Sequence, residues 1–390
     1  MQKQQANITD KIIAEISELL ANEKSYQHVL SSMCTPPKDI IRTIAGLFAE
    51  INLGDPGLFP KAVEMEQDVL AELASLLNAP QGWVGTITSG GSESNLLGCW
   101  AARNWARKKK KIQKGTILLP LSAHVSFEKA RDILDVKAKW IGLDEHFQMD
   151  ITRVQEAITK DTFGIVGIAG TTGTGVCDNI KALSDLAEDH ELFLHVDAAH
   201  GGTIFPFLSE LGLSAPSFAF ENPGVKSIGV DTHKMMGGLI PGGSIIFREK
   251  TYTEAIAKNI SYLSDSSTQQ LTVTGTRPGN SVIASWVLLK KLGREYMLER
   301  VRSCMENTAY FVHQLEQLEE IKLPFQPTIN IIGFRCTSIA NEELAMNLRK
   351  KGWALSIYDQ WLRIVVMPHV SKETIDLFVA DLKKSIQGER

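Results

Sequence analysis

The sequence predicts an α/β protein, with a large domain built on a mostly parallel seven-stranded sheet and a small C-terminal α+β domain. Between Trp83 and Phe247, seven short β-rich runs alternate with helical stretches. That alternation is typical of a parallel sheet covered by helices. Strands and helices mix again beyond residue 328, after a long helical region. A chain of 390 residues is long enough for both domains.

The first sixty residues are predicted to form a helix and an arm. Apolar residues recur at helical spacing over residues 9–20, which favours an amphipathic helix there. Pro36-Pro37 and the run Asn-Leu-Gly-Asp-Pro-Gly at 52–57 then predict an extended arm with turns. A second amphipathic helix, expected over 62–77, leads into the large domain.

The seven β-rich runs are expected at residues 83–88, 116–120, 138–143, 163–169, 192–196, 227–230 and 244–247. In parallel sheets, ligands bind beyond the carboxyl ends of the strands. Residues suited to chemistry follow five of these runs: Ser92, His124, Thr172, Asp197 and Lys234. We therefore expect these side chains to meet at one edge of the sheet.

The C-terminal part is predicted to begin with a bridging helical region over 281–318, which is rich in Leu, Lys and Arg. Strands are expected over 328–336, 354–358 and 361–367, and helices over 341–351 and 372–386. The predicted organisation is an N-terminal helix and arm at 1–60, a large ligand-binding domain at 61–290 and a small domain at 291–390.

Composition and charge exclude several classes of function. The net charge is −4, with 44% hydrophobic and 22% charged residues, so neither nucleic acid nor a membrane surface is an expected partner. The five cysteines form no CxxC pair and no regular spacing, so no metal site and no disulfide framework are expected. The polar N-terminus lacks a signal-type apolar run. We expect a cytoplasmic protein.

Residues 88–95, Thr-Ser-Gly-Gly-Ser-Glu-Ser-Asn, join a strand to an apolar helical run. Glycines let backbone amides approach an anion, hydroxyl groups donate hydrogen bonds, and a helix N-terminus carries partial positive charge. A phosphate therefore fits this turn, although an ordinary helix cap explains the same residues. The pattern matches neither GxGxxG nor the nucleotide-triphosphate loop.

Asp197, Lys234 and His124 indicate what the phosphate belongs to. Asp197 ends a buried strand among small residues, where a carboxylate needs a cation such as a protonated pyridine nitrogen; capping the next turn is the alternative. Lys234 lies beside glycines, where its amine can form a Schiff base; a surface lysine is the alternative. His124 can stack on a flat ring, or be an ordinary histidine. Together they describe a pocket for an anionic aromatic aldehyde.

Five motifs resemble, in order and spacing, those of the pyridoxal-phosphate-dependent group II amino acid decarboxylases. They are Gly-Ser-Glu-Ser-Asn at 91–95, His124 with Ser126 and Lys129-Ala130, Gly-Thr-Thr at 170–172, Asp-Ala-Ala-His-Gly-Gly at 197–202, and Asp-Thr-His-Lys at 231–234. The resemblance covers nearly the whole chain. It implies an aspartate aminotransferase-like fold (fold type I) and the cofactor pyridoxal 5'-phosphate.

The resemblance also implies which residues hold the phosphate. Gly91 and Ser92 would bind it with help from His233. Gly275 and Thr276 would approach it from a partner subunit, as in related dimers. The implied assembly is a homodimer with active sites at the subunit interface.

Around the cofactor ring, the resemblance assigns one task to each residue. His124 would stack on the ring face, Thr172 would line the ring near Asp197, Asp197 would pair with the ring nitrogen, and Lys234 would carry the cofactor as a Schiff base. Tyr262 lies in the Ser/Asp/Thr/Gln-rich stretch 261–270, which is similar to the family's catalytic loop; its hydroxyl would protonate the substrate carbon after CO₂ departs. A plain loop tyrosine is the alternative.

Arg363, in Trp-Leu-Arg-Ile-Val, matches the C-terminal arginine that meets the substrate carboxylate in the family, and a structural salt bridge is the alternative. The chain length, Ser-Met-Cys-Thr-Pro-Pro at 32–37 and Arg-Ile-Val-Val-Met-Pro-His at 363–369 are most similar to the archaeal L-tyrosine/L-aspartate decarboxylases. In that group tyramine serves methanofuran biosynthesis and β-alanine serves coenzyme A biosynthesis.

Three alternatives stay open at this point. Lys-Met-Met-Gly at 234–237 resembles other group II members, so L-glutamate is a possible substrate. Another lyase of the same fold is a second alternative. A protein that binds pyridoxal phosphate without turnover is the third.

Overall fold

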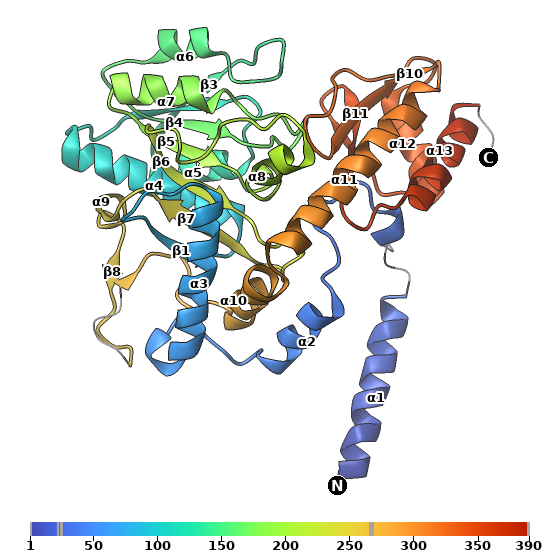
Figure 1. The fold of residues 1–390 in the computed structure, drawn as a ribbon, viewed down its shortest axis with the longest axis horizontal. Helices are drawn as coiled ribbons and strands as arrows, with labels where there is room; N and C mark the ends of the chain where they lie inside the picture. Colours follow the sequence, from blue (N-terminus) through green and yellow to red (C-terminus); the bar gives the residue numbers. More distant parts are fainter. Residues whose placement is uncertain (1, 22, 24–25, 265–268, 388–390) are drawn as a thin grey trace.

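The computed structural model describes residues 2–21, 23, 26–264 and 269–387. Its main body is an α/β layer structure, from which a smaller C-terminal unit projects (Figure 1). Helix α1 (Gln2–Leu19) extends away from both. Among the described residues, no helix has the length and apolar character needed to cross a membrane.

The large sheet has seven strands in the order β1-β7-β6-β5-β4-β2-β3. They are β1 (Val84–Thr88), β2 (Thr116–Pro120), β3 (Lys137–Ile141), β4 (Thr162–Ile168), β5 (Phe193–Asp197), β6 (Val225–Val230) and β7 (Gly243–Phe247). Only β7 runs against its neighbours, so the other carboxyl ends share one edge. The predicted mostly parallel seven-stranded sheet is confirmed.

Helices cover both faces of this sheet. Helix α4 (Gly91–Lys109) packs across β5, β6 and β7 beside α5 (Ser126–Leu134), whereas α7 (Ile180–Asp189) packs on β4 and β5 from the other face. Strands β4 and β5 are buried along their whole length, as expected for central parallel strands. The remaining helices of this body are α3 (Pro60–Leu76), α6 (Ile151–Ala157), α8 (Phe205–Leu208) and α9 (Lys250–Thr253).

The small C-terminal unit is an antiparallel sheet in the order β10-β11-β13-β12. Its strands are β10 (Ile321–Lys322), β11 (Ile331–Cys336), β12 (Ser356–Tyr358) and β13 (Trp361–Val365), and its helices are α12 (Asn341–Lys350) and α13 (Lys372–Ile386). A separate apolar core, with Trp353 and Phe378 at its centre, holds it together. The predicted small α+β domain is confirmed as architecture.

One local prediction was wrong. The segment after Pro36-Pro37 is not only an extended arm, because helix α2 (Asp39–Leu47) forms there and buries Ile41 and Ile44.

The helical region predicted over 281–318 is present. It consists of α10 (Gly279–Trp286), a π-helical stretch, Val287–Leu292, and α11 (Gly293–Glu316), which follow one another directly. Gly293 has a φ of 70°, which a glycine adopts without strain. A two-stranded ribbon of β8 (Lys258–Asn259) and β9 (Gln269–Gln270) completes the fold.

The N-terminal arm connects the small unit to the sheet edge. Val29 bridges Ala354, and the Leu30 amide donates to the Ala354 carbonyl at 3.0 Å. The arm then passes the carboxyl ends of the strands, so Met33 lines the cavity found there. Met33 and Lys234, about 200 residues apart in the sequence, therefore line one cavity.

Candidate active site

A cavity of about 230 Å³ opens at the carboxyl edge of the sheet, at the predicted position. Seventeen residues line it, and seven of them belong to the predicted set: Gly91, Ser92, His124, Thr172, Asp197, His233 and Lys234. Each follows or ends a strand of the large sheet. The rule that ligands bind beyond the carboxyl ends of parallel strands therefore locates the site.

The turn between β1 and α4 forms a cradle at one side of this cavity. Gly90 has a φ of 116°, and α4 begins at Gly91. A Cβ on Gly91 would lie 3.0 Å from Ala199 Cβ and 3.1 Å from Asp231 Oδ2, so a side chain there would crowd the cavity wall. The Glu93 and Ser94 amides donate to the Gly90 carbonyl. The first two amides of α4, those of Gly91 and Ser92, can therefore donate to a phosphate.

Asp197 ends β5, and its side chain is held at both oxygens. The Ala199 amide donates to Oδ1 at 3.0 Å, and Asn95 Nδ2 donates to Oδ2 at 2.8 Å. The residue is 7% exposed, and it lines the cavity. No lysine or arginine pairs with it among the described residues. A buried carboxylate of this kind fits a protonated ring nitrogen.

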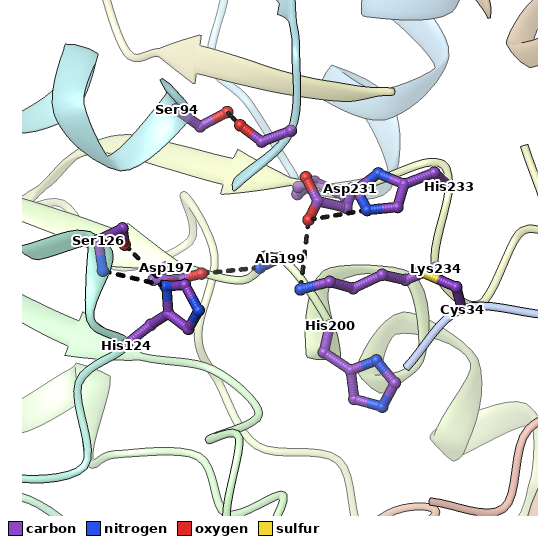
Figure 2. Close-up of polar contacts among 12 residues, drawn as sticks. Cys34, Ser94, His124, Ser126, Asp197, Ala199, His200, Asp231, His233 and Lys234 are labelled. Atoms are coloured by element: carbon purple, nitrogen blue, oxygen red, sulfur yellow. Dashed lines mark hydrogen bonds and ion pairs between the residues drawn. The ribbon is translucent and has the colours of Figure 1, made fainter. Parts of the chain in front are cut away.

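Lys234 is paired with Asp231, as Figure 2 shows. Its Nζ lies 3.2 Å from Asp231 Oδ2, and the Asp231 side chain is 2% exposed. Burial raises the pKa of the Asp231 carboxyl, and the nearby Lys234 and His233 only partly oppose this. Asp231 belongs to the Asp-Thr-His-Lys motif, but no task was predicted for it. Its spacing of three residues before Lys234, directly after a buried strand, was the available signal.

His233 faces the same carboxylate from the other side. Its Nδ1 lies 2.5 Å from the Gly242 carbonyl oxygen, which can only accept, so Nδ1 carries a proton. Nε2 lies 3.9 Å from Asp231 Oδ2. The ring is thereby fixed beside the Gly90-Gly91 cradle, where a Cβ on Gly90 would lie 3.4 Å from His233 Cε1.

His124 lies across the cavity from Lys234, at the start of α5 (Figure 2). Its Nδ1 lies 3.0 Å from Ser126 Oγ, and it accepts from the Ser126 amide at 3.2 Å. Burial lowers the pKa of His124, so the ring is neutral near pH 7. Thr172 lines the cavity from the β4 side.

His200 is a cavity residue that sequence reasoning did not single out. Its Nε2 lies 3.0 Å from Asn330 Oδ1 in the small unit, and its buried Nδ1 has no hydrogen-bond partner within the described chain. Burial, together with Lys234, lowers the pKa of His200 to about 3. It is therefore a neutral ring tied to the small unit.

Four predicted residues do not line this cavity. Arg363 is 8% exposed, and its guanidinium donates to the carbonyls of Thr172 at 2.9 Å and Ser31 at 2.6 Å. Tyr262 is 86% exposed. Gly275 and Thr276 lie against Gly54 instead. Residues 265–268 of the predicted catalytic loop lie outside the described residues.

The residues that are present fit pyridoxal 5'-phosphate. The cradle and His233 suit its phosphate, Asp197 suits its ring nitrogen, and Lys234 suits its aldehyde. No group of three or more His, Cys, Asp or Glu residues is arranged for a metal ion among the residues that the structure describes.

Comparisons with known proteins agree with this fit. Residues 45–337 match the family model described as the pyridoxal-dependent decarboxylase conserved domain. An L-aspartate/L-glutamate decarboxylase from Pyrococcus horikoshii is 41% identical over 377 residues, which cover 96% of this chain and 97% of that protein. An L-aspartate decarboxylase from Thermococcus kodakarensis is also 41% identical, with 96% of each chain covered.

A probable L-tyrosine/L-aspartate decarboxylase from Methanothermobacter thermautotrophicus is 40% identical over 91% of this chain and 96% of its own. Among solved structures, a sphingosine-1-phosphate lyase from Burkholderia pseudomallei superposes with a TM-score of 0.89 at 24% identity, covering 98% of this chain and 90% of its own. A glutamate decarboxylase from Lactobacillus brevis gives 0.88 at 22% identity, covering 97% and 91%. These two likenesses confirm the fold.

Proposed function

This chain belongs to the family of pyridoxal-dependent decarboxylases, and we propose that it converts L-aspartate to β-alanine, L-tyrosine to tyramine, or both. One observation carries the choice: the three relatives described above are 40–41% identical over more than nine tenths of the chain, and all are named for L-aspartate. L-Tyrosine and L-glutamate each appear in one of those names. L-Aspartate is therefore the first substrate to test.

The protein supplies binding, orientation and charge to this reaction. When bound, pyridoxal 5'-phosphate accepts the electrons of the bond between Cα and the departing carboxylate. Lys234 would hold the cofactor through its aldehyde. Asp197 would keep a proton on the ring nitrogen, because an ion pair favours the charged form. Gly91, Ser92 and His233 would hold the phosphate.

His124 and Thr172 would orient the ring. The neutral His124 ring can stack on a flat aromatic face, and Thr172 lines the same cavity as Asp197. Holding cofactor and substrate in one orientation would favour breakage of the bond between Cα and the carboxylate. Both residues would therefore contribute by position.

Arg363 is proposed to meet the substrate carboxylate only after a change of partners. Its Nε is buried and has no hydrogen-bond partner among the described residues, so one donor is available. The carbonyl of Thr172, which the guanidinium now binds, belongs to a cavity residue. Arg363 thus does not line the cavity, but it contacts a residue that does.

The active assembly is proposed to be a homodimer located in the cytoplasm. Helix α1 projects from the body with an exposed apolar stripe, of which Ile12 is 50%, Ile16 49% and Leu19 74% exposed. A second copy of this chain is the occupant we assign to this stripe. Gly275, Thr276 and Tyr262, which are absent from their own cavity wall, would reach the partner's cavity. The products β-alanine and tyramine would enter coenzyme A and methanofuran biosynthesis.

A substrate panel tests this function. Purified protein loaded with pyridoxal 5'-phosphate should release CO₂ from L-aspartate or L-tyrosine and leave the corresponding amine. Transamination or β-elimination without CO₂ would refute the proposal, and activity on L-glutamate alone would replace its substrate. Lys234→Ala should lose the visible absorbance of the loaded protein. That absorbance without turnover of any of the three amino acids would leave a cofactor-binding protein.

A further inference from the structure

A chain of buried hydrogen bonds connects Asp197 to the core of the large domain. Asn95 Nδ2 donates to Asp197 Oδ2 at 2.8 Å, and Asn95 Oδ1 lies 3.1 Å from His195 Nε2. On its other side, His195 Nδ1 lies 2.8 Å from Ser227 Oγ. Asn95 and His195 are 1% exposed, and Ser227 is fully buried. Water therefore does not compete for these bonds.

The arrangement follows from the sheet geometry. His195 and Asp197 are two residues apart on β5, so both point to the face that α4 covers. Asn95, in the first turns of α4, reaches both of them. Gly98 makes room for the imidazole, because a Cβ there would lie 2.5 Å from His195 Nδ1. One amide is thereby placed between an imidazole and a carboxylate.

The direction of every bond in the chain can be deduced. An ionised Asp197 only accepts, so the amide nitrogen of Asn95 must face it. The amide oxygen then faces His195, so His195 Nε2 carries the proton. Burial lowers the pKa of His195 to about 4, so the ring is neutral and its Nδ1 accepts from Ser227 Oγ. Along the chain from Ser227 through His195 and Asn95 to Asp197, each residue therefore donates to the next one.

The same amide also reaches the other side of the cavity. The second Nδ2 hydrogen of Asn95 faces Ser126 Oγ at 3.0 Å, and that hydroxyl can donate to His124 Nδ1 at 3.0 Å (Figure 2 shows the Ser126–His124 pair). His124 Nδ1 is then an acceptor, and its proton lies on Nε2. Asn95 thus fixes Asp197 and, through Ser126, the His124 ring.

We propose that Asn95 is a positioning residue, which His195 and Ser227 hold in one orientation so that it donates to the Asp197 carboxylate facing the cofactor ring nitrogen. This inference rests on the cofactor role proposed above. Asn95 also lines the cavity, but its task concerns Asp197. Without its amide, Asp197 Oδ2 loses its one donor among the described residues, and the carboxylate is no longer held toward the ring.

The test compares two cofactors on the apo-protein. Pyridoxal 5'-phosphate presents a ring nitrogen to Asp197, whereas its deaza analogue has carbon at that position and keeps the aldehyde and phosphate. Equilibrium dissociation constants are measured by visible absorbance for the wild type, Asn95→Leu and Asn95→Asp. Asn104→Leu is the matched control, because Asn104 lies on the same helix and donates to the Ala255 carbonyl at 2.9 Å, away from the cavity.

We expect the wild type to prefer pyridoxal phosphate over its analogue, and Asn95→Leu to reduce that preference by about 10- to 100-fold, the usual worth of a hydrogen bond to a charged group. Asn95→Asp keeps the shape of the side chain and the acceptor toward His195, but it should also reduce the preference for pyridoxal phosphate. Asn104→Leu should preserve it. An unchanged preference in a folded Asn95 variant, or an equal loss for both cofactors, overturns the proposal. A wild type that binds neither cofactor overturns the proposed function instead.

Discussion

Replacing Asp231 by asparagine should accelerate capture of the cofactor by Lys234. In the structure, Asp231 stabilises the ammonium form of Lys234 from 3.2 Å, and an ammonium group cannot attack an aldehyde. The substitution keeps the shape of the side chain and removes its charge. The ion pair that holds the Lys234 amine is then lost.

The size of the rate increase expected for Asp231→Asn follows from two opposing contributions to the free energy. Two unit charges 3.2 Å apart attract by about 5 kcal/mol at an effective dielectric constant near 20. Burial of the carboxylate opposes this, as the raised pKa of Asp231 shows. Asparagine also retains an oxygen that can accept from the ammonium. We therefore expect the lower end of the range for a charged hydrogen bond, about 1.5 kcal/mol or roughly a tenfold faster reaction.

Stopped-flow absorbance after mixing apo-protein with pyridoxal 5'-phosphate at pH 7 measures this rate. Asp185→Asn is the matched control, because Asp185 forms an exposed pair with Lys181 at 2.6 Å and lies on α7. Its rate should equal that of the wild type. A slower Asp231→Asn variant with unchanged thermal unfolding would refute the reasoning, and would show that Asp231 orients the amine more than it restrains it.

Three further predictions concern the loop, the helix packing and pH. Tyr262→Phe should retain cofactor absorbance but form amine about 100-fold more slowly, as expected for loss of a proton donor; an unimpaired variant would remove Tyr262 from the reaction. Gly98→Ala should lower the free energy of unfolding by about 1–3 kcal/mol in urea, because its Cβ meets His195, whereas Gly46→Ala meets nothing within 4 Å and should not. Burial raises the pKa of Asp178 from 3.8 to about 6, so the folded protein binds a proton at this carboxyl more tightly than the unfolded chain does. The resulting contribution to the free energy of unfolding is complete below pH 4 and should be lost, by about 3 kcal/mol, as the pH rises through 6. This pH dependence should be absent in Asp178→Asn.

The sheet and the edge that carries the candidate cavity could be predicted because both depend on local patterns. Buried β-rich runs alternate with helices, and Asp197 and Lys234 directly follow or end such runs. Helix α2 was missed because Pro36-Pro37 suggested an extended arm, although Ile41 and Ile44 have helical spacing and a helix can begin shortly after prolines. The spacing of the two isoleucines therefore indicated the helix, but the two prolines were given more weight.

The residues behind Asp197 could not be predicted in this way. Asn95 and His195 are 100 residues apart, and they meet only because α4 crosses β5 in the folded sheet. The contacts of Arg363 with Thr172 and Ser31 likewise join three distant segments. Periodicity identifies which face of an element is buried, but it does not identify which polar side chains meet across that face.

The charges around the cavity favour different tasks for its two carboxylates. Asp197 and Asp231 are both buried. Among the described residues that line the cavity, Lys234 is the one lysine, and there is no arginine. His124 and His200 are neutral because burial lowers their pKa values. Lys234 balances Asp231, so one negative charge remains, and it lies at Asp197. A ligand that brings a proton on a ring nitrogen neutralises that charge, whereas its deaza analogue leaves a bare carboxylate against the ring. We therefore expect the carboxylate that has no cation of its own, Asp197, to set the preference of the site for pyridoxal 5'-phosphate over its deaza analogue.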